Sequence, residues 1–338
     1  MDHRARGHRG TRRATASAVA LLVAAGLAAC GGGGTTATPT TGSTAWTVAR
    51  TEPASVGRAN AGFYGVSCPT PSFCAAVDGS GNAVLWNGTH WTTPAPATPG
   101  GGSLNSVSCA SPTFCVALNG QLAVVFDGTT WTTTSAVGPA PTGPTGGQYQ
   151  VSCTSPTFCA SVNTAGVATL FDGTTWGHDA LVDDGTADKP VQNISCASPT
   201  FCVVVSATGN IATFNGTSWA RQPSPGQSLL HSVSCPTTRF CMAVDLTGHA
   251  IVWDGSTWSA AQAMPDSATL TFSVSCATPD RCLVARSDGS VSVWQSGTWS
   301  VPQPVLSDGT VASADVSCAS ASFCAVVDTA GSAATTRA

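Results

Sequence analysis

Short apolar segments alternate with turn-forming residues along this chain, and the stretch from Val107 to Trp131 shows the pattern. It starts with Val-Ser-Cys, turns through Ala-Ser-Pro-Thr-Phe, and continues with a second apolar segment that begins at Cys115. A third apolar segment, Ala123 to Phe126, is followed by Asp-Gly-Thr-Thr and by a fourth segment that begins at Trp131. Asp-Gly or Asn-Gly between two such segments is a strong signal for a β-hairpin. The pattern therefore predicts four short antiparallel strands.

The same pattern occurs seven times, and pairs of cysteines mark the repeats. The two cysteines of a pair are six positions apart, and the first and last pairs are 318 − 68 = 250 residues apart over six steps, a period of about 42 residues. The pairs are Cys68 with Cys74, Cys109 with Cys115, Cys153 with Cys159, Cys196 with Cys202, Cys235 with Cys241, Cys276 with Cys282 and Cys318 with Cys324. Four antiparallel strands in such a period are the signature of a β-propeller blade. We therefore predict an all-β fold, a seven-bladed β-propeller, over residues 45–338.

The two ends of the repeat region predict how the ring closes. The seventh unit ends at Ala338, after its third strand, and lacks the strand that begins with tryptophan. A single strand of that kind, Thr44 to Thr47, precedes the first unit. Placed beside the last unit, this N-terminal strand completes the seventh blade. Each blade then has one tryptophan on its fourth strand: Trp46, Trp91, Trp131, Trp176, Trp219, Trp258 and Trp299.

These tryptophans permit two interpretations, sugar binding by an exposed aromatic face and packing between blades. A further aromatic residue ends the third strand of six units: Trp86, Phe126, Phe171, Phe214, Trp253 and Trp294. With a two-residue Asn-Gly turn, Trp91 pairs with Val84 and lies diagonally from Trp86. A large side chain on an outer strand fills the widening gap between wedge-shaped blades. We therefore favour packing.

The paired cysteines are predicted to form one disulfide per blade. The spacing of six across a tight turn places the two sulfurs on facing strands, where a bridge is geometrically reasonable. Metal binding and redox catalysis are the alternatives. A metal site needs further ligands nearby, and the histidines after the first cysteine occupy no repeated position: His90, His178, His231 and His249. Redox catalysis favours a single Cys-x-x-Cys.

A polar residue follows the second strand of every unit, and a glycine usually follows three positions later. The polar residues are Asp78, Asn119, Asn163, Ser206, Asp245, Arg286 and Asp328. A ring of calcium-binding carboxylates is one interpretation, and the Asn, Ser and Arg members argue against it. Asp or Asn at the start of a turn bonds its own backbone, and the glycine then adopts the left-handed conformation. We predict a turn role, and no metal site, cofactor or catalytic residue.

The N-terminus predicts export and lipidation. An Arg-rich segment up to Arg13 and an apolar run up to Ala29, too short for a membrane span, form a signal peptide over residues 1–29. Leu-Ala-Ala-Cys, ending at Cys30, resembles the lipobox of bacterial lipoproteins, in which the cysteine is acylated; an ordinary signal peptide is the alternative. Acylation of Cys30 leaves 14 of the 15 cysteines, all of them in pairs. Residues 30–44 are rich in Gly and Thr and are predicted to tether the propeller to the outer face of the bacterial cytoplasmic membrane.

Charge excludes one class of partner. The chain has 13 basic and 17 acidic residues, and five of the basic and one of the acidic residues lie within the first 13 positions. The remainder has 8 − 16, a net charge of −8. An acidic chain of this kind is not suited to a phosphate backbone, so we predict no nucleic-acid partner.

The repeat resembles a known family. Val-Ser-Cys-x-x-Pro-x-Phe-Cys with Asp-Gly-Thr-x-Trp is similar to secreted Cys-repeat proteins of actinobacteria that are grouped with sialidase-like (BNR/Asp-box) propellers. The resemblance implies the propeller, and it implies an activity only if the sialidase residues are present. An Asp box has one residue between its aspartate and its glycine. In this chain Asp127 is followed directly by Gly128. The sialidase set of an arginine triad, a tyrosine nucleophile with a glutamate partner and an aspartate acid/base cannot be placed. Glu52, in the first loop, is the only glutamate, the tyrosines are Tyr64 and Tyr149, and the arginines are concentrated in the late blades: Arg221, Arg239, Arg281 and Arg286.

Three functions remain. The first is a membrane-tethered extracytoplasmic binding module, a monomer whose glycan or protein ligand binds the variable loops between the fourth strand of one blade and the first strand of the next. The long loops within Thr132–Gln150, Gly177–Gln192 and Ala220–Leu230 differ most; the second contains Asp179, Asp183, Asp184 and Asp188. The alternatives are a structural envelope lipoprotein and a sialidase-like glycoside hydrolase.

Overall fold

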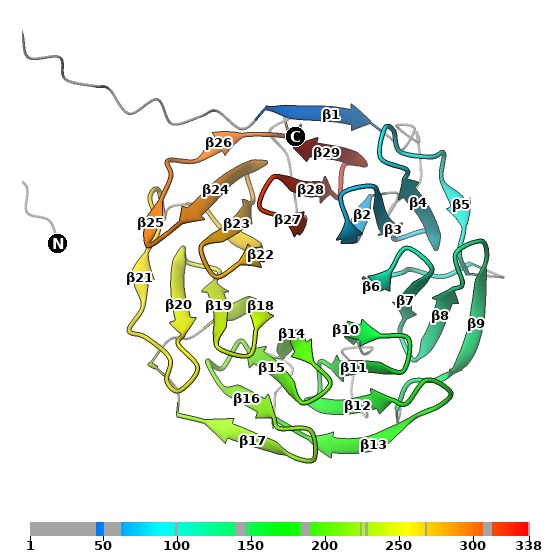
Figure 1. The fold of residues 1–338 in the computed structure, drawn as a ribbon, viewed down its shortest axis with the longest axis horizontal. Coiled ribbons are helices and arrows are strands. Elements are labelled where there is room, and N and C mark those ends of the chain that lie inside the picture. The colour runs from blue at the N-terminus through cyan, green and yellow to red at the C-terminus, as the bar shows by residue number, and fades with distance from the viewer. Residues whose placement is uncertain are drawn as a thin grey trace, which may run out of the picture. The chain divides into compact units, whose positions relative to one another are not determined.

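The compact unit of the protein, Thr44–Ala338, is a ring of seven four-stranded antiparallel sheets in the computed structural model (Figure 1). The structure describes residues 45–50, 62–98, 101–138, 147, 149–183, 190–223, 225–226, 229–267, 269–306 and 313–336. Cys30, the predicted signal peptide and the predicted tether lie outside these residues. The predicted seven-bladed propeller is confirmed.

The first strand of each blade lies nearest the centre of the ring, and the fourth strand lies at the rim (Figure 1). First strands are β2 (Phe63–Thr70), β6 (Ser106–Ser111), β10 (Tyr149–Ser155), β14 (Val191–Ser198), β18 (Leu230–Thr237), β22 (Thr271–Thr278) and β27 (Ala314–Ser320). Second strands are β3 (Phe73–Asp78), β7 (Phe114–Asn119), β11 (Phe158–Asn163), β15 (Phe201–Ser206), β19 (Phe240–Asp245), β23 (Arg281–Arg286) and β28 (Phe323–Asp328).

The outer half of each blade is less regular. Third strands are β4 (Asn82–Trp86), β8 (Leu122–Phe126), β12 (Val167–Phe171), β16 (Ile211–Phe214), β20 (His249–Trp253), β24 (Ser290–Gln295) and β29 (Ser332–Thr336). Fourth strands are β5 (Ala95–Pro96), β9 (Trp131–Ala136), β13 (Trp176–Leu181), β17 (Trp219–Gln222), β21 (Gln262–Ala263), β25 (Thr298–Trp299), which β26 (Gln303–Pro304) extends on β24, and β1 (Trp46–Arg50). We number the blades 1 to 7 by their first strands, from β2 to β27.

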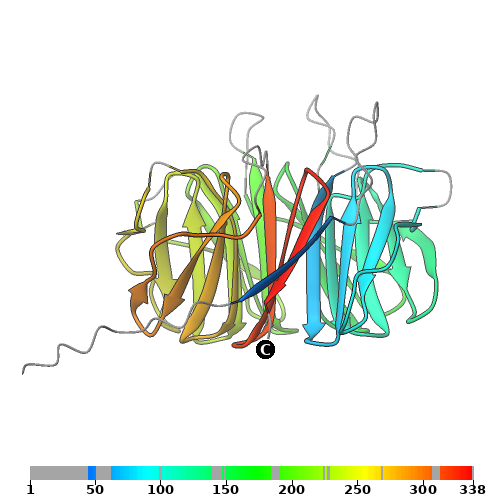
Figure 2. The same cartoon turned by 90° about the horizontal axis from the view of Figure 1, so that it is seen from above.

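Closure of the ring by the N-terminal strand is confirmed. β1 pairs antiparallel with β29 from Trp46 opposite Thr336 to Arg50 opposite Ser332, and it completes the sheet of blade 7. β1 crosses the outside of this blade in the side view (Figure 2).

Each disulfide joins the first two strands of a blade, as predicted, with Cα atoms between 3.9 Å and 4.1 Å apart. The bonded pairs are Cys68 with Cys74, Cys109 with Cys115, Cys153 with Cys159, Cys196 with Cys202, Cys235 with Cys241, Cys276 with Cys282 and Cys318 with Cys324. The second cysteine of every pair is almost fully buried. The disulfides therefore fix the inner hairpins.

The core consists of apolar clusters, most of them between neighbouring blades. One such cluster joins Ala75 and Val77 of blade 1 to Leu104, Val124 and Phe126 at the start of and within blade 2. The fourth-strand tryptophans add to these clusters, because each described pair of indole and third-strand aromatic ring lies 5.1 Å to 5.8 Å apart between centroids. Packing is thus their structural role.

The predicted register of this aromatic pair was wrong by two residues. Trp91 lies directly opposite Trp86, not opposite Val84. The reason is the turn, in which the Asn87 side-chain oxygen accepts the backbone N–H groups of Thr89 and His90, at 3.0 Å each. A side chain that caps the loop stabilises a four-residue turn in place of the two-residue one.

The same cap recurs in other blades with aspartate. Backbone and hydroxyl hydrogen bonds from Thr130 and Thr129 hold the pKa of Asp127 well below its usual range. The corresponding contacts, from the backbone of Thr257 first, lower the pKa of Asp254 to about 2. These exposed turns therefore keep their charged caps at any ordinary pH.

Candidate binding site at the central channel

The innermost strand of every blade has a free edge that faces the centre of the ring, and its amides need acceptors. The serine of each Val-Ser-Cys motif (Ile-Ser-Cys in blade 4) supplies one, because its Oγ accepts the backbone N–H of the cysteine in the next blade. Ser108, for example, accepts the N–H of Cys153 at 2.9 Å. All seven such bonds are present at 2.9–3.0 Å, including the one from Cys68 to Ser317 that closes the ring. We call these serines the serine ring: Ser67, Ser108, Ser152, Ser195, Ser234, Ser275 and Ser317.

A second, incomplete layer of side-chain hydrogen-bond acceptors lies two residues before the serines of the serine ring. At five of the seven blade junctions a side-chain oxygen accepts the amide that precedes the ring serine of the next blade. The five acceptors are Ser106, Asn193, Ser232, Ser273 and Asp315. At the junction of blades 1 and 2 this position is Gly65, which has no side chain. The channel wall is therefore uneven at this level.

β-Bulges add further side chains to the channel. In blade 1, Phe63 pairs with Asp78 and Gly65 pairs with Val77, so Tyr64 is an extra residue in the strand. Blades 4, 5 and 6 have the same irregularity at Gln192, His231 and Phe272. A bulge re-aims the extra side chain, and bulges are frequent beside binding and active sites. All four bulge residues line the channel cavity.

The cavity has a volume of about 320 Å³ and a mainly polar wall. Its wall consists of the bulge residues, the second-layer residues and amides such as those of Asn105 and Gln150. These residues come from the starts of the first strands, which the variable loops precede. The cavity therefore opens on the face that the sequence predicts to bind.

Two ionisable groups of the wall depart from their usual pKa. Burial lowers the pKa of His231 to about 4, and its ring packs edge-on against Phe272 with centroids 6.1 Å apart. Burial also raises the pKa of Asp315, against the opposing effect of hydrogen bonds from Ser273 and from the amides of Val66 and Val316. At neutral pH His231 is therefore uncharged.

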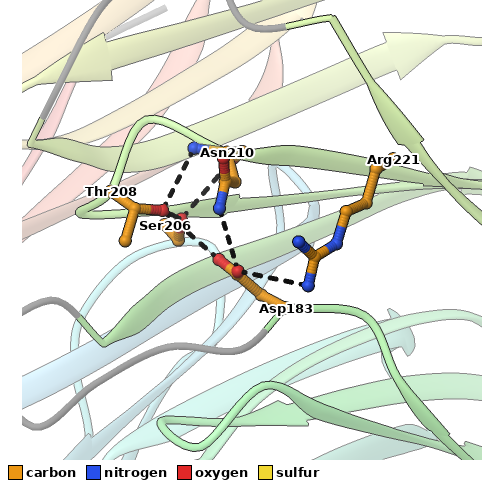
Figure 3. Close-up of polar contacts among 5 residues, drawn as sticks. All are labelled: Asp183, Ser206, Thr208, Asn210 and Arg221. Carbon is orange, nitrogen blue, oxygen red and sulfur yellow. Dashed lines mark hydrogen bonds and ion pairs between the residues drawn. The ribbon is translucent and has the colours of Figure 1, made fainter.

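The acidic loop of blade 3 has a structural role where it is described. Asp183 is buried, accepts Nδ2 of Asn210 at 3.0 Å, and lies 3.8 Å from the Arg221 guanidinium (Figure 3). Asn210 and Arg221 belong to blade 4, so this contact fastens two blades. Asp184 and Asp188 lie outside the described residues, as does the side chain of Asp179.

Four of the polar residues after the second strands accept backbone amides of the turn that follows, as predicted: Asp78, Asn163, Asp245 and Asp328. Asp78 accepts the amides of Ser80 and Asn82 at 2.8 Å and 2.7 Å, and Gly81 has a φ of +83°. Arg286 is fully buried and donates to the carbonyls of Pro265 and Asp266 in the preceding blade. Among the described residues, no group of three or more His, Cys, Asp or Glu is placed to hold a metal ion.

The channel wall was not predicted from the sequence. The repeated serine of Val-Ser-Cys was a visible signal for the serine ring, since a polar residue between two buried ones recurs in every unit. The bulges leave no comparable signal, because each one lies at the start of a first strand, directly after a loop whose length varies between units.

Comparison with known proteins supports the fold. No protein-family model and no curated protein sequence matches this chain. A solved structure described as YCF48 bound to D1 peptide is similar, with a TM-score of 0.62, 15% identity, and coverage of 87% of this chain and 97% of that chain. The WD40 β-propeller domain of Doa1 is also similar, with a TM-score of 0.66, 13% identity, and coverage of 82% and 93%.

YCF48 from Cyanidioschyzon merolae gives a TM-score of 0.63 at 13% identity, with coverage of 87% of this chain and 98% of that chain. At such identities the similarity extends to the propeller architecture alone. Within the described part of the chain, no helix has the length and apolar character needed to cross a membrane.

Proposed function

We propose that this protein is a lipid-anchored, extracytoplasmic binding module of the bacterial envelope, and that a segment of a protein partner enters the central channel from the face with the variable loops. The observation that carries this proposal is the set of four bulges, which direct Tyr64, Gln192, His231 and Phe272 into one polar cavity. A propeller held only by repeated packing has no need of these irregularities. The fold is consistent with a binding or scaffold role.

Two further observations support a protein ligand. The cavity wall offers both aromatic rings and hydrogen-bonding groups, which suits an extended peptide. One of the similar propellers is described as bound to a peptide. A glycan ligand and a purely structural envelope role are the alternatives that the experiments below distinguish.

Anchoring and export rest on the lipobox-like Leu-Ala-Ala-Cys and on the odd cysteine count. We expect the intact mass of the protein purified from membranes to match a chain that starts at a diacylated Cys30. We also expect no alkylatable thiol among the other 14 cysteines. A mature chain without lipid, or with several free thiols, would contradict the anchored and exported state.

The channel itself is tested with peptides. The full chain, released from membranes with detergent and immobilised, is exposed to a pool of acetylated random heptapeptide amides, and retained peptides are identified by mass spectrometry. We expect retention that is lost in the double variant with Tyr64→Ala and Phe272→Ala. A matched control with Leu181→Ala and Val301→Ala removes two exposed apolar side chains elsewhere and should retain the peptides.

Three outcomes decide against the channel as a peptide site. Equal retention by the wild type and the channel variant places binding elsewhere. Retention of envelope glycans but of no peptide, in a parallel array, indicates a glycan ligand. Retention of neither favours the structural role.

A further inference from the structure

Two of the capped turns contain an asparagine that is followed directly by glycine: Asn87-Gly88 in blade 1 and Asn215-Gly216 in blade 4. Both asparagines are exposed to solvent. The amide nitrogen of the glycine can attack the side-chain amide carbon of the asparagine, because glycine has no Cβ to shield that nitrogen. Among the described residues, neither glycine amide has a hydrogen-bond acceptor. Each amide is therefore available as a nucleophile.

The cap surrounds the side-chain oxygen of Asn87 with hydrogen-bond donors. Its Oδ1 accepts the backbone N–H groups of Thr89 and His90, at 3.0 Å each, and the Thr89 hydroxyl at 2.8 Å. Attack on the amide carbon moves negative charge onto this same oxygen. Donors that already surround an oxygen on which charge develops stabilise the transition state, as an oxyanion hole does. The turn therefore favours the attack.

An imidazole lies beside the nitrogen that must leave. Nε2 of His90 is 3.2 Å from Nδ2 of Asn87, and Nδ1 of His90 is 3.0 Å from the Thr89 hydroxyl oxygen. The side-chain nitrogen departs as ammonia only after it gains a proton. A histidine within hydrogen-bond distance of that nitrogen can carry the proton to it. The turn thus combines a nucleophile, an oxyanion site and a proton carrier.

The turn of blade 4 has the same cap and no imidazole. Oδ1 of Asn215 accepts the N–H groups of Thr217 and Ser218, at 3.0 Å and 2.9 Å, and the Thr217 hydroxyl at 2.9 Å. Ser218 stands at the position that His90 has in blade 1. The chain therefore contains an internal control: two Asn-Gly turns with matched donors, of which one has a histidine at the leaving nitrogen.

From this arrangement we infer that Asn87 is a self-modifying residue, which deamidates spontaneously with His90 as the proton carrier. The amide nitrogen of Gly88 forms a bond to Cγ of Asn87, and the bond between Cγ and Nδ2 breaks. The proton that the Gly88 amide loses is balanced by the proton that the departing ammonia gains. Water then opens the cyclic imide at either of its carbonyls and gives aspartate or isoaspartate at position 87. The reaction needs no co-reactant other than water.

The two products affect the turn differently. Aspartate keeps the cap and adds a negative charge, since Asp127 and Asp172 hold the equivalent turns with the same hydrogen bonds. Isoaspartate places an additional methylene in the main chain, so the geometry of the cap is lost. Isoaspartate should therefore loosen the turn that holds Trp91 opposite Trp86.

The test compares the two turns within one molecule. The purified full chain is incubated in neutral buffer, samples are digested, and mass spectrometry follows deamidation in the peptides that contain each asparagine. We expect Asn87 of the folded protein to react about tenfold faster than Asn215, a modest effect for general acid–base catalysis. In urea, where the turns are unfolded, the two rates should become equal.

Two substitutions exchange the decisive residue between the turns. His90→Ser should lower the rate at Asn87 to that at Asn215, and Ser218→His should raise the rate at Asn215 about tenfold. Both positions are exposed, so neither substitution is expected to prevent folding. His249→Ser removes a histidine at the start of β20 in blade 5. It is the matched control and should change neither rate.

Three results would overturn the inference. Equal rates at Asn87 and Asn215 in the folded chain would show that the imidazole has no effect. An unchanged rate at Asn87 in His90→Ser would exclude His90 as the proton carrier. A ratio that persists in urea would trace the difference to the local sequence and not to the folded turn.

Discussion

A single hydroxyl per blade holds the inner edges of the propeller together. Each serine of the serine ring accepts the amide of a cysteine 40 to 45 residues further along the chain, or, at the closure, 249 residues away. The innermost strand of an open ring would otherwise present unsatisfied amides. Because the serine ring joins blades and not strands within a blade, it acts on the association of blades.

Removal of one member of the serine ring should therefore destabilise the whole fold. Ser108→Ala leaves the Cys153 amide without its acceptor, and such a loss typically costs about 1–3 kcal/mol of the free energy of unfolding. Thr133→Ala on the exposed outer strand is the matched control and should change the free energy of unfolding by less than about 0.5 kcal/mol. Urea unfolding followed by tryptophan fluorescence measures both. Equal midpoints for the two variants would contradict the role of the serine ring.

The partly buried imidazole of His231 makes stability depend on pH. Its pKa is lowered to about 4 in the folded protein, whereas an unfolded histidine titrates near 6.5. Between these values the unfolded chain binds more protons, so the free energy of unfolding falls as the pH falls from about 6.5 to about 4. His231→Gln should abolish this fall in the free energy of unfolding, which is of the order of 2 kcal/mol. A series of urea unfolding curves over that pH range measures it. Gln192→Ala, at an equivalent bulge without an ionisable group, should retain it.

At the scale of the element, every blade has an inner hairpin that a disulfide constrains, and the fourth strands vary in length from two to six residues. The disulfides join the first two strands, and in blades 1 to 5 a turn capped by Asn or Asp follows the third strand. Several fourth strands are only two residues long, as in β5, β21 and β25. Stability is thus concentrated towards the centre of the ring.

Loss of one disulfide should weaken the protein by a predictable amount. A loop of this size contributes about 2 kcal/mol by the loop-entropy relation. The double variant of blade 3 with Cys153→Ser and Cys159→Ser should therefore lose about that much of the free energy of unfolding without loss of the fold. Urea unfolding of this variant under oxidising conditions measures the change. A change below about 0.5 kcal/mol would show that the serine ring and the packing already fix the hairpin.

At the scale of the molecule, closure depends on the pairing of β1 with β29. The five residue pairs from Trp46 to Arg50 are the connection between the N-terminal strand and the last blade, and Trp46 packs on a cluster that spans blades 6 and 7. β1 contains no cysteine, so no disulfide joins this strand to the blade. Closure is therefore held by backbone hydrogen bonds and packing.

A chain that lacks β1 should lose protection mainly at the closure. We expect hydrogen–deuterium exchange of β29 amides to become at least about tenfold faster when the chain starts after Arg50, because β29 becomes an edge strand. The amides of β11 and β12, on the far side of the ring, should exchange at nearly wild-type rates. Uniform acceleration in all blades would instead show that the ring unfolds as one cooperative unit on loss of β1.

The sequence predicted the elements and the architecture because both follow from repetition. Seven cysteine pairs, the Asp-Gly turns and the isolated Trp46 strand determine the strand count, the disulfides and the closure without reference to any distant contact. The register at Trp91 was mispredicted because a side-chain cap at Asn87 changes the loop length. The channel site was not predicted, since it depends on bulges such as that at Tyr64, in which the repeated pattern is broken.

The position of β1 also determines how the molecule carries a load. Any tension applied to the segment before Trp46 enters the fold through the strand that closes the ring, and the hydrogen bonds between β1 and β29 bear it first. The disulfides cannot share this load, because each one staples a hairpin within its own blade. The propeller is therefore mechanically weakest where its N-terminal segment joins it, and a sustained pull would strip β1 from blade 7 while the inner hairpins of all seven blades remain covalently stapled.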